Sequence, residues 1–166
     1  MIQTNFFQKY CIDACAILDF WDTQTRTRPY HVKVKSFRAI WEYISSKVDD
    51  GTIVVPKIVA EEIKSIPGND ELKNWLDRNK GKFIGHSTYL GELQKIVQKY
   101  PIYTKDRGSL EDALVIAISM GNNLTVITSE VLVKQHSPIK PKIPNVCEDF
   151  SVKWMNLPEF FEAEGL

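Results

Sequence analysis

Short, mainly apolar runs alternate with longer segments of helical spacing along this chain of 166 residues. The runs at 10–12, 52–55 and 124–128 are too apolar for strands that turn one face to water, and such runs are typical of strands buried in a parallel sheet. Between them, apolar side chains recur every three or four residues, as in the helix expected at 37–48. Alternating strands and helices predict an α/β fold with a central parallel sheet.

Five strands are expected, at residues 10–13, 52–55, 82–84, 124–128 and 152–155. Helices are expected at residues 14–21 (with a loop as the alternative), 37–48, from Pro56 onwards, 69–78, 88–100, 109–120 and 157–163. Gly121 is expected to end the helix at 109–120. The charged residues 103–108 and the proline-rich residues 136–145 predict loops.

The composition fits one domain, residues 1–166, with a full hydrophobic core. Lys+Arg and Asp+Glu both count 21, so the net charge neither indicates nor excludes a nucleic-acid partner. Cys11, Cys15 and Cys147 fit no disulfide framework, which predicts reduced packing residues in a cytoplasmic protein. No apolar run is long enough to span a membrane, and residues 1–5 carry no secretory pattern.

Four acidic residues occupy one kind of place, where an expected strand ends or a helix begins: Asp13, Glu62, Asp112 and Glu130. The carboxyl ends of parallel strands line one edge of a sheet, and ligand sites form there. Carboxylates gathered at that edge repel one another unless a positive charge lies between them, and Mg²⁺ or Mn²⁺ suits an all-oxygen site. The pattern predicts a metal-dependent enzyme that transfers phosphate groups or cleaves phosphodiesters.

Each acid also has a structural alternative. Asp13 can cap the segment that follows it. Residues 109–112 fit a capping box, in which Asp112 reaches back to Ser109. Glu130 alone is typical of a surface residue after a strand, and its weight comes from the other three acids. The nearest substitutes are Asp19, Asp22, Asp106 and Glu111.

Helical geometry distinguishes Glu62 from its neighbour Glu61. The apolar stripe of this helix consists of Val59, Ile63 and Ile66. At about 100° per residue, Glu62 borders that stripe and Glu61 points away from it. Glu62 is therefore the expected site residue, and a surface position with a buried stem is its alternative.

A basic stretch follows the first acid in the sequence. It contains Arg26, Arg28, Lys33, Lys35 and Arg38. Near the sheet edge, these side chains would hold a phosphate backbone, with Trp21 and Tyr30 available to stack on bases. A solvated loop that contacts nothing is the alternative.

Five segments carry a family resemblance: YCIDACAIL (10–18), VVPKIVAEEI (54–63), EDALVIA (111–117), VITSE (126–130) and KIPNVC (142–147). In this order and spacing they resemble the PIN-domain family of Mg²⁺/Mn²⁺-dependent nucleases. They are most similar to a PIN-like branch of small prokaryotic proteins, many of them related to the toxins of toxin–antitoxin pairs.

The resemblance implies a three-layer α/β/α sandwich with a central parallel sheet of strand order 3-2-1-4-5. It also implies a metal-dependent endoribonuclease with RNA as its substrate. The residues that would hold Mg²⁺ or Mn²⁺ are Asp13, Glu62, Asp112 and Glu130. Thr128 and Ser129 are expected to hydrogen-bond a carboxylate or the phosphate. An antitoxin protein and a second copy of the chain are the candidate partners.

The chain departs from the family pattern after its first strand. Many members have Asp-Thr-Ser there, whereas this chain has Asp13-Ala14-Cys15, with no hydroxyl at either position. The departure favours a rival function, a PIN-like domain with a weakened site that binds RNA or a protein, although the four acids favour the enzyme. A second rival is a phosphatase with Asp13 as nucleophile, but residues 14–16 offer no second Asp as its acid.

Overall fold

The computed structural model describes residues 8–22, 37–105, 107–135 and 137–166. Its strands are β1 (Tyr10–Ile12), β2 (Ile53–Val54), β3 (Thr125–Ile127) and β4 (Trp154–Met155). Its α-helices are α1 (Ala14–Asp22), α2 (Phe37–Asp49), α3 (Lys57–Ser65), α4 (Asp70–Asn79), α5 (Leu90–Lys99), α6 (Arg107–Asn122), α7 (Ile143–Asp149) and α8 (Leu157–Glu164). Three short 3-10 helices are η1 (Lys80–Lys82), η2 (Ser87–Tyr89) and η3 (Pro101–Thr104).

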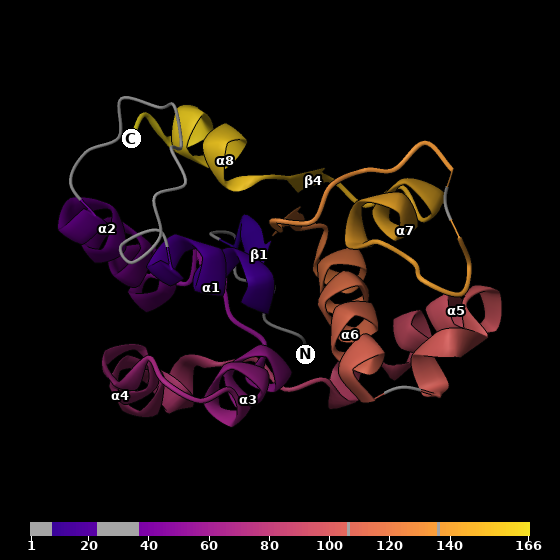
Figure 1. Cartoon of the computed structure of the whole chain (residues 1–166), viewed down its shortest axis with the longest axis horizontal. Coiled ribbons are helices and arrows are strands. Elements are labelled where there is room, and N and C mark those ends of the chain that lie inside the picture. The colour runs from indigo at the N-terminus through magenta and orange to yellow at the C-terminus, as the bar shows by residue number, and fades with distance from the viewer. Residues whose placement is uncertain (1–7, 23–36, 106, 136) are drawn as a thin grey trace.

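The four strands form one parallel sheet in the order β2-β1-β3-β4. β1 lies in the middle, where Tyr10 pairs with Ile53 of β2 and Thr125 of β3. In Figure 1 the sheet lies between α1, α2 and α8 on one side and α5, α6 and α7 on the other. The expected α/β fold with a central parallel sheet is confirmed, and the carboxyl ends of all four strands share one edge.

Helix α6 is the most deeply buried helix and lies against β1 and β3. Its residues from Ala113 to Ile118 are at most 2% exposed, as the apolar composition on all sides of this helix predicts. Because the helix cannot shift without disturbing the core, its amino-terminal half gives a rigid support for the acidic side chains it carries. No helix in the described part of the chain is long and apolar enough to cross a membrane.

The strand expected at residues 82–84 is wrong. Only Ile84 takes part in sheet pairing, through a single parallel bridge to Pro56. Two backbone hydrogen bonds form this bridge, Lys57 N to Ile84 O at 2.8 Å and Ile84 N to Val55 O at 3.0 Å. Gly81 and Gly85 flank the segment, and glycine weakens strands, so the pairing ends after one residue on the outer side of β2.

Two expected loops contain helical residues. Helix α6 begins at Arg107, inside the expected loop at 103–108, so Ser109 is its third residue and the expected capping box with Asp112 is wrong. Helix α7 begins at Ile143, inside the expected loop at 136–145. Prolines suggested that loop, but Pro144 lies in the first turn, where its missing N–H breaks no helical hydrogen bond.

Gly121 does not end α6, because the helix continues to Asn122. The left-handed residue that follows is Asn123, with φ of 54°. A Cβ on Gly121 would lie 2.7 Å from Cδ1 of Tyr89, so this glycine admits the tyrosine ring against the helix. The other element boundaries differ from the expected ones by one or two residues, the usual uncertainty of helix and strand ends.

Candidate active site

Asp13 lies where β1 meets α1 at the carboxyl edge of the sheet. Its backbone N–H donates to the carbonyl of Ile127 at 3.0 Å, so it continues the pairing of β1 with β3. Its Oδ1 accepts a hydrogen bond from the N–H of Ala14 at 2.7 Å, at the start of α1. The side chain is 3% exposed. Asp13 thus has both of its expected positions, at the sheet edge and at the beginning of a helix.

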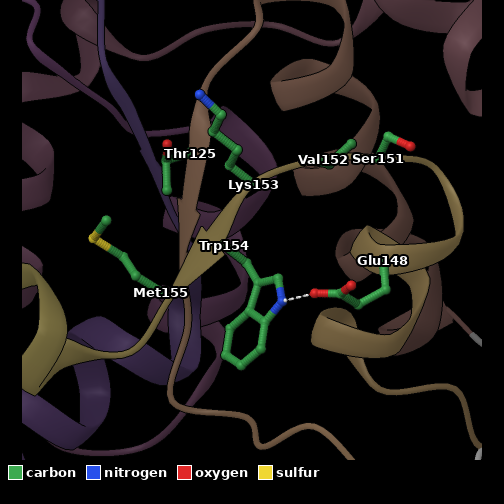
Figure 2. A pocket seen from close by; sticks show the side chains of 7 residues that line it. All are labelled: Thr125, Glu148, Ser151, Val152, Lys153, Trp154 and Met155. Carbon is green, nitrogen blue, oxygen red and sulfur yellow. Dashed lines mark hydrogen bonds between the residues drawn. The ribbon is translucent and has the colours of Figure 1, made fainter.

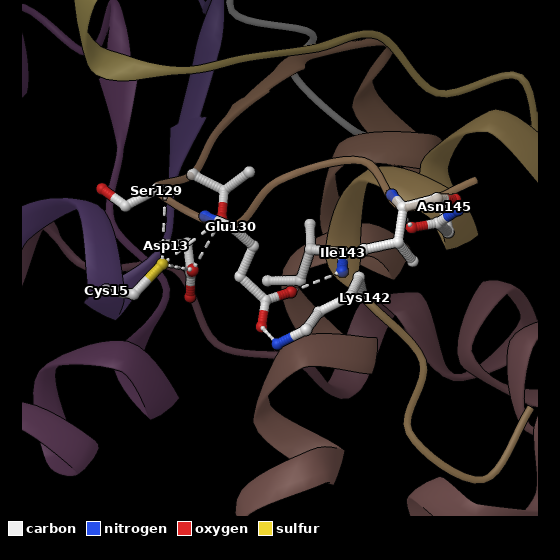
Figure 3. Close-up of polar contacts among 9 residues, drawn as sticks. Asp13, Cys15, Ser129, Glu130, Lys142, Ile143 and Asn145 are labelled. Carbon is white, nitrogen blue, oxygen red and sulfur yellow. Dashed lines mark hydrogen bonds and ion pairs between the residues drawn. The ribbon is translucent and has the colours of Figure 1, made fainter. Parts of the chain in front are cut away.

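Two side chains donate to the other carboxylate oxygen of Asp13 (Figure 3). These are the thiol of Cys15 and, at 3.1 Å, the hydroxyl of Thr128. Cys15 also accepts the N–H of Ser129 at 3.3 Å, which ties α1 to the turn after β3. Cys15 therefore supplies a donor to the first acid although it lacks a hydroxyl. Burial raises the pKa of Asp13 above its ordinary value, the charge of Glu130 adds to this, and the donated hydrogen bonds act in the opposite direction.

Glu62 lies on α3 and borders its buried stripe. It is half-buried while Glu61 is exposed, so the orientation expected from helical geometry is confirmed. Burial raises the pKa of Glu62 to about 7, and the negative charges of Glu111 and Asp13 contribute. A hydrogen bond with Glu111 acts in the same direction. Glu62 therefore faces the acids on α6 and β1 and turns away from solvent.

Asp112 lies on α6, which packs against α3. Burial raises the pKa of Asp112 to about 8, followed by the charges of Asp13, Glu130, Glu62 and Glu111. All four expected site residues therefore lie close enough to act on one another, although they come from β1, α3, α6 and the turn after β3. Glu111 was expected only as a substitute for Asp112, because adjacent helical residues normally point about 100° apart.

Glu130 follows β3 and is held by two donors (Figure 3). One oxygen lies 3.1 Å from Nζ of Lys142, and the other accepts the backbone N–H of Ile143 at 2.6 Å. The side chain of Glu130 is 22% exposed and that of Lys142 is 44% exposed. Glu130 thus caps the start of α7 as well as facing the acidic group. The sequence did not single out Lys142, because its partner lies twelve residues earlier on a different element.

Tyr103 adds a buried polar group on which two of these acids act. It belongs to η3 and is 1% exposed, and its hydroxyl has no hydrogen-bond partner among the described residues. Burial raises the pKa of this phenol far above its ordinary value, followed by the charges of Asp112 and Glu130. Sequence reasoning missed Tyr103 because it falls in a segment that was expected to be a charged loop.

The donor chemistry fits Mg²⁺ or Mn²⁺, which prefer carboxylate oxygens. The raised pKa values of Glu62 and Asp112 show carboxylates whose charges oppose one another, a repulsion that a divalent cation would relieve. Within the described ranges, however, no three Asp, Glu, His or Cys side chains are gathered closely enough to hold a metal ion. Asp13 and Glu130 instead accept hydrogen bonds from protein donors, so metal binding requires Glu130 to exchange Lys142 for the cation.

Two cavities lie away from the acidic group. One, of about 390 Å³, lies along β4 and is lined by Trp154, whose Nε1 donates to Glu148 at 2.8 Å (Figure 2). It contains a single carboxylate and does not resemble a metal site. The other, of about 320 Å³, lies on the outer face of α3 and is lined by Lys57, Ala60, Glu61, Lys64, Lys80 and Phe83. We call this second cavity the lysine pocket.

Several residues expected at the site fall outside the described part of the chain. These are Arg26, Arg28, Tyr30, Lys33, Lys35 and Asp106. Arg38 is described, on α2, where its Nε pairs with Glu42 at 3.0 Å and both side chains are exposed. The expected role of the basic stretch in substrate binding therefore stays a prediction.

Comparison with protein families gives a match over most of the chain. A family profile described as Domain of unknown function (DUF4411) matches residues 10–166. A search of curated proteins found no match. The matched range contains every strand and α-helix of the described residues, together with Asp13, Glu62, Glu111, Asp112 and Glu130.

Proposed function

We propose that this chain, which belongs to the DUF4411 family, is a divalent-metal-dependent ribonuclease that hydrolyses RNA phosphodiester bonds. Its proposed metal ligands are Asp13, Glu62, Asp112 and Glu130. One observation carries the proposal: these carboxylates come from four different parts of the fold, and burial together with neighbouring acidic charges raises the pKa values of Asp13, Glu62 and Asp112. Folding brings like charges together at a cost, and proteins keep such groups where a cation or a reaction uses them.

The proposal includes a PIN-like fold. The strand order β2-β1-β3-β4, with Ile84 bridged to the outer side of β2, supports the expected order 3-2-1-4-5 with its outermost strand reduced to one residue. The toxin role and the antitoxin partner rest on the sequence resemblance alone and stay predictions. A second copy of the chain as partner also stays a prediction.

The surroundings of each acid suit it to a different role in the proposed reaction. Asp13, oriented by Cys15 and Thr128, presents a fixed carboxylate. Glu62, as a carboxylate, can accept a proton from an attacking water. A bound cation would supply water of lowered pKa and offset charge on the phosphate. We expect Ser129, which follows β3, to hydrogen-bond the phosphate.

The lysine pocket is a candidate surface for the RNA backbone. Lys57 and Lys80 line it and form no ion pair among the described residues, whereas Lys64 pairs with Asp77. Helix α3 carries both this pocket and Glu62, so a strand bound along the helix would reach the acids. Phosphate contacts by lysine are independent of base sequence.

An RNA cleavage assay tests the proposal. The purified protein should cleave single-stranded RNA with Mn²⁺ or Mg²⁺ and lose this activity in chelator. Glu62→Gln should lose at least a hundredfold in rate, while Glu71→Gln, an exposed residue of α4 outside the lysine pocket, should keep the wild-type rate. Equal rates for the two variants, or undiminished cleavage in chelator, would rule out the proposed site.

A second candidate function is a domain that binds RNA or a protein without cleaving. It is favoured by the hydrogen bonds that occupy both oxygens of Asp13 and both of Glu130. In that case RNA should bind equally well with and without divalent metal, and no cleavage should appear at any metal concentration.

A further inference from the structure

Tyr103 differs from the other tyrosines that the structure describes, because their hydroxyl groups form hydrogen bonds and its own does not. Tyr10 and Tyr43 both donate to Glu164, and Tyr100, three residues before Tyr103, donates to Asp149. The hydroxyl of Tyr103 is buried and has no partner in the described part of the chain. A buried donor without an acceptor destabilises a folded protein, and native structures rarely keep one without a use for it.

Asp112 has the complementary feature, a carboxylate without a hydrogen-bond donor among the described residues. It is half-buried, yet its carboxylate accepts no hydrogen bond from any residue that the structure describes. The two groups belong to neighbouring elements, since η3 packs against α6. Asp112 is also the charge that acts most strongly on the phenol, ahead of Glu130. A donor without an acceptor and an acceptor without a donor thus belong to two packed elements, close enough for the charge of Asp112 to act on the phenol.

Glu130 is less suitable as the acceptor. Lys142 and the N–H of Ile143 already occupy its two oxygens. A metal-bound carboxylate commonly uses one oxygen for the cation, and a neighbouring donor holds the other in place. Both oxygens of Asp112 are available, one for the cation and one for the hydrogen-bond donor.

We propose that Tyr103 is a positioning residue whose hydroxyl donates a hydrogen bond to one oxygen of Asp112 when the other oxygen holds a divalent cation. The hydrogen bond fixes the orientation of the carboxylate and disperses its charge. The inference rests on the proposed function in one respect, the binding of a divalent cation by the acids. It assigns Tyr103 no contact with RNA.

The test uses the full chain and the variant Tyr103→Phe, which removes one oxygen and leaves the ring. Titration calorimetry with Mn²⁺ should show about 10- to 100-fold weaker binding by the variant, the usual loss when a partner of a metal ligand is removed. Thermal melts in chelator should show a metal-free variant at least as stable as the wild type, because the hydroxyl has no partner there. If Tyr103 only packed against its neighbours, its replacement would not weaken Mn²⁺ binding while leaving the metal-free protein as stable as before.

Tyr100→Phe, at the residue that directly precedes η3, is the matched control. Its hydroxyl is bonded to Asp149, so this variant should melt at a lower temperature and keep wild-type affinity for Mn²⁺. Wild-type affinity in Tyr103→Phe would overturn the inference and leave the proposed metal site standing. A lower metal-free melting temperature of Tyr103→Phe would also overturn it. Failure of the wild type itself to bind Mn²⁺ would remove the metal site and the inference together.

Discussion

The carboxylate of Glu130 lies 3.1 Å from the ammonium of Lys142. This ion pair lies at the carboxyl edge of the sheet, where the charge of Glu130 also acts on Asp13 and Asp112. Among the described residues, Lys142 therefore supplies a positive charge to the acidic group. A divalent cation bound there would compete with Lys142 for Glu130.

Replacement of Lys142 by Met should therefore strengthen Mn²⁺ binding. We expect an increase of about two- to fivefold, because a partly exposed ion pair is worth roughly 0.5–1 kcal/mol. The metal-free protein should lose a similar amount of stability. Titration calorimetry and melts in chelator measure the two effects, with exposed Lys140→Met as the control. Weaker Mn²⁺ binding by Lys142→Met would mean that Lys142 assists the site instead of competing for it.

The metal-free protein should lose stability as the pH rises. Folding raises the pKa of Asp112 from 3.8 to about 8. Below pH 3.8 the carboxyl is protonated in both the folded and the unfolded protein and does not oppose folding. The free energy of unfolding then falls as the pH rises from 3.8 through about 8. Asp112→Asn removes the charge and should flatten the decline between pH 6 and 9. Melts in chelator across that range measure it, with Glu61→Gln as the control. A steeper decline in Asp112→Asn than in the wild type would contradict the assignment.

Glu164 should show the opposite pH dependence at the other end of the sheet. Burial alone would raise its pKa, but hydrogen bonds from Lys9, Tyr10 and Tyr43 lower it from 4.5 to about 2. Its contribution is therefore present above pH 4.5 and lost as the pH falls through about 2. Allowing for solvent around the exposed Lys9, we expect Glu164→Gln to cost about 2 kcal/mol at pH 7.

Denaturant unfolding at pH 7 and at pH 2 separates this effect of Glu164 from general acid denaturation. The difference between wild type and Glu164→Gln should shrink at the lower pH. Glu162→Gln, on the same helix, serves as the control. A difference that stays constant or grows on acidification would show that the network around Glu164 does not stabilise the fold through its charge.

The lysine pocket should contribute to RNA affinity and not to chemistry. In Asp13→Asn, which prevents cleavage during the measurement, the additional changes Lys57→Ala and Lys80→Ala should weaken binding of single-stranded RNA. They should also reduce the slope of log affinity against log salt concentration by about 1.4, or 0.7 per lost contact. Lys95→Ala and Lys153→Ala, exposed lysines on other elements, are the controls. An unchanged slope in the pocket variant would show that RNA does not bind there.

Apolar pattern alone was sufficient for the parts of the fold that are buried on both faces. The strands β1 and β3 and the deeply buried α6 were expected because continuous apolar runs have few other structures open to them. Polar composition was misleading at 103–108 and 136–145, because an exposed first helical turn tolerates charge and proline. The beginnings of α6 and α7 were missed for this reason.

The candidate site was also predictable only in part from the sequence. Helical geometry separated Glu62 from Glu61, and strand ends indicated Asp13 and Glu130. The sequence could not reveal the donors to these acids, since Cys15 and Thr128 meet only when α1 folds against β3. Tyr103 has no local signal at all, because its burial and lack of a partner come entirely from tertiary packing.

Single-turnover cleavage of a labelled single-stranded RNA by wild type and by Asp13→Asn, each with Mn²⁺, tests the central claim most directly. Both proteins should be folded, because Asn keeps an acceptor for the N–H of Ala14. We expect metal-dependent cleavage by the wild type and a loss of at least a hundredfold in Asp13→Asn. Equal rates for the two proteins would contradict the claim that this acidic group is the active site.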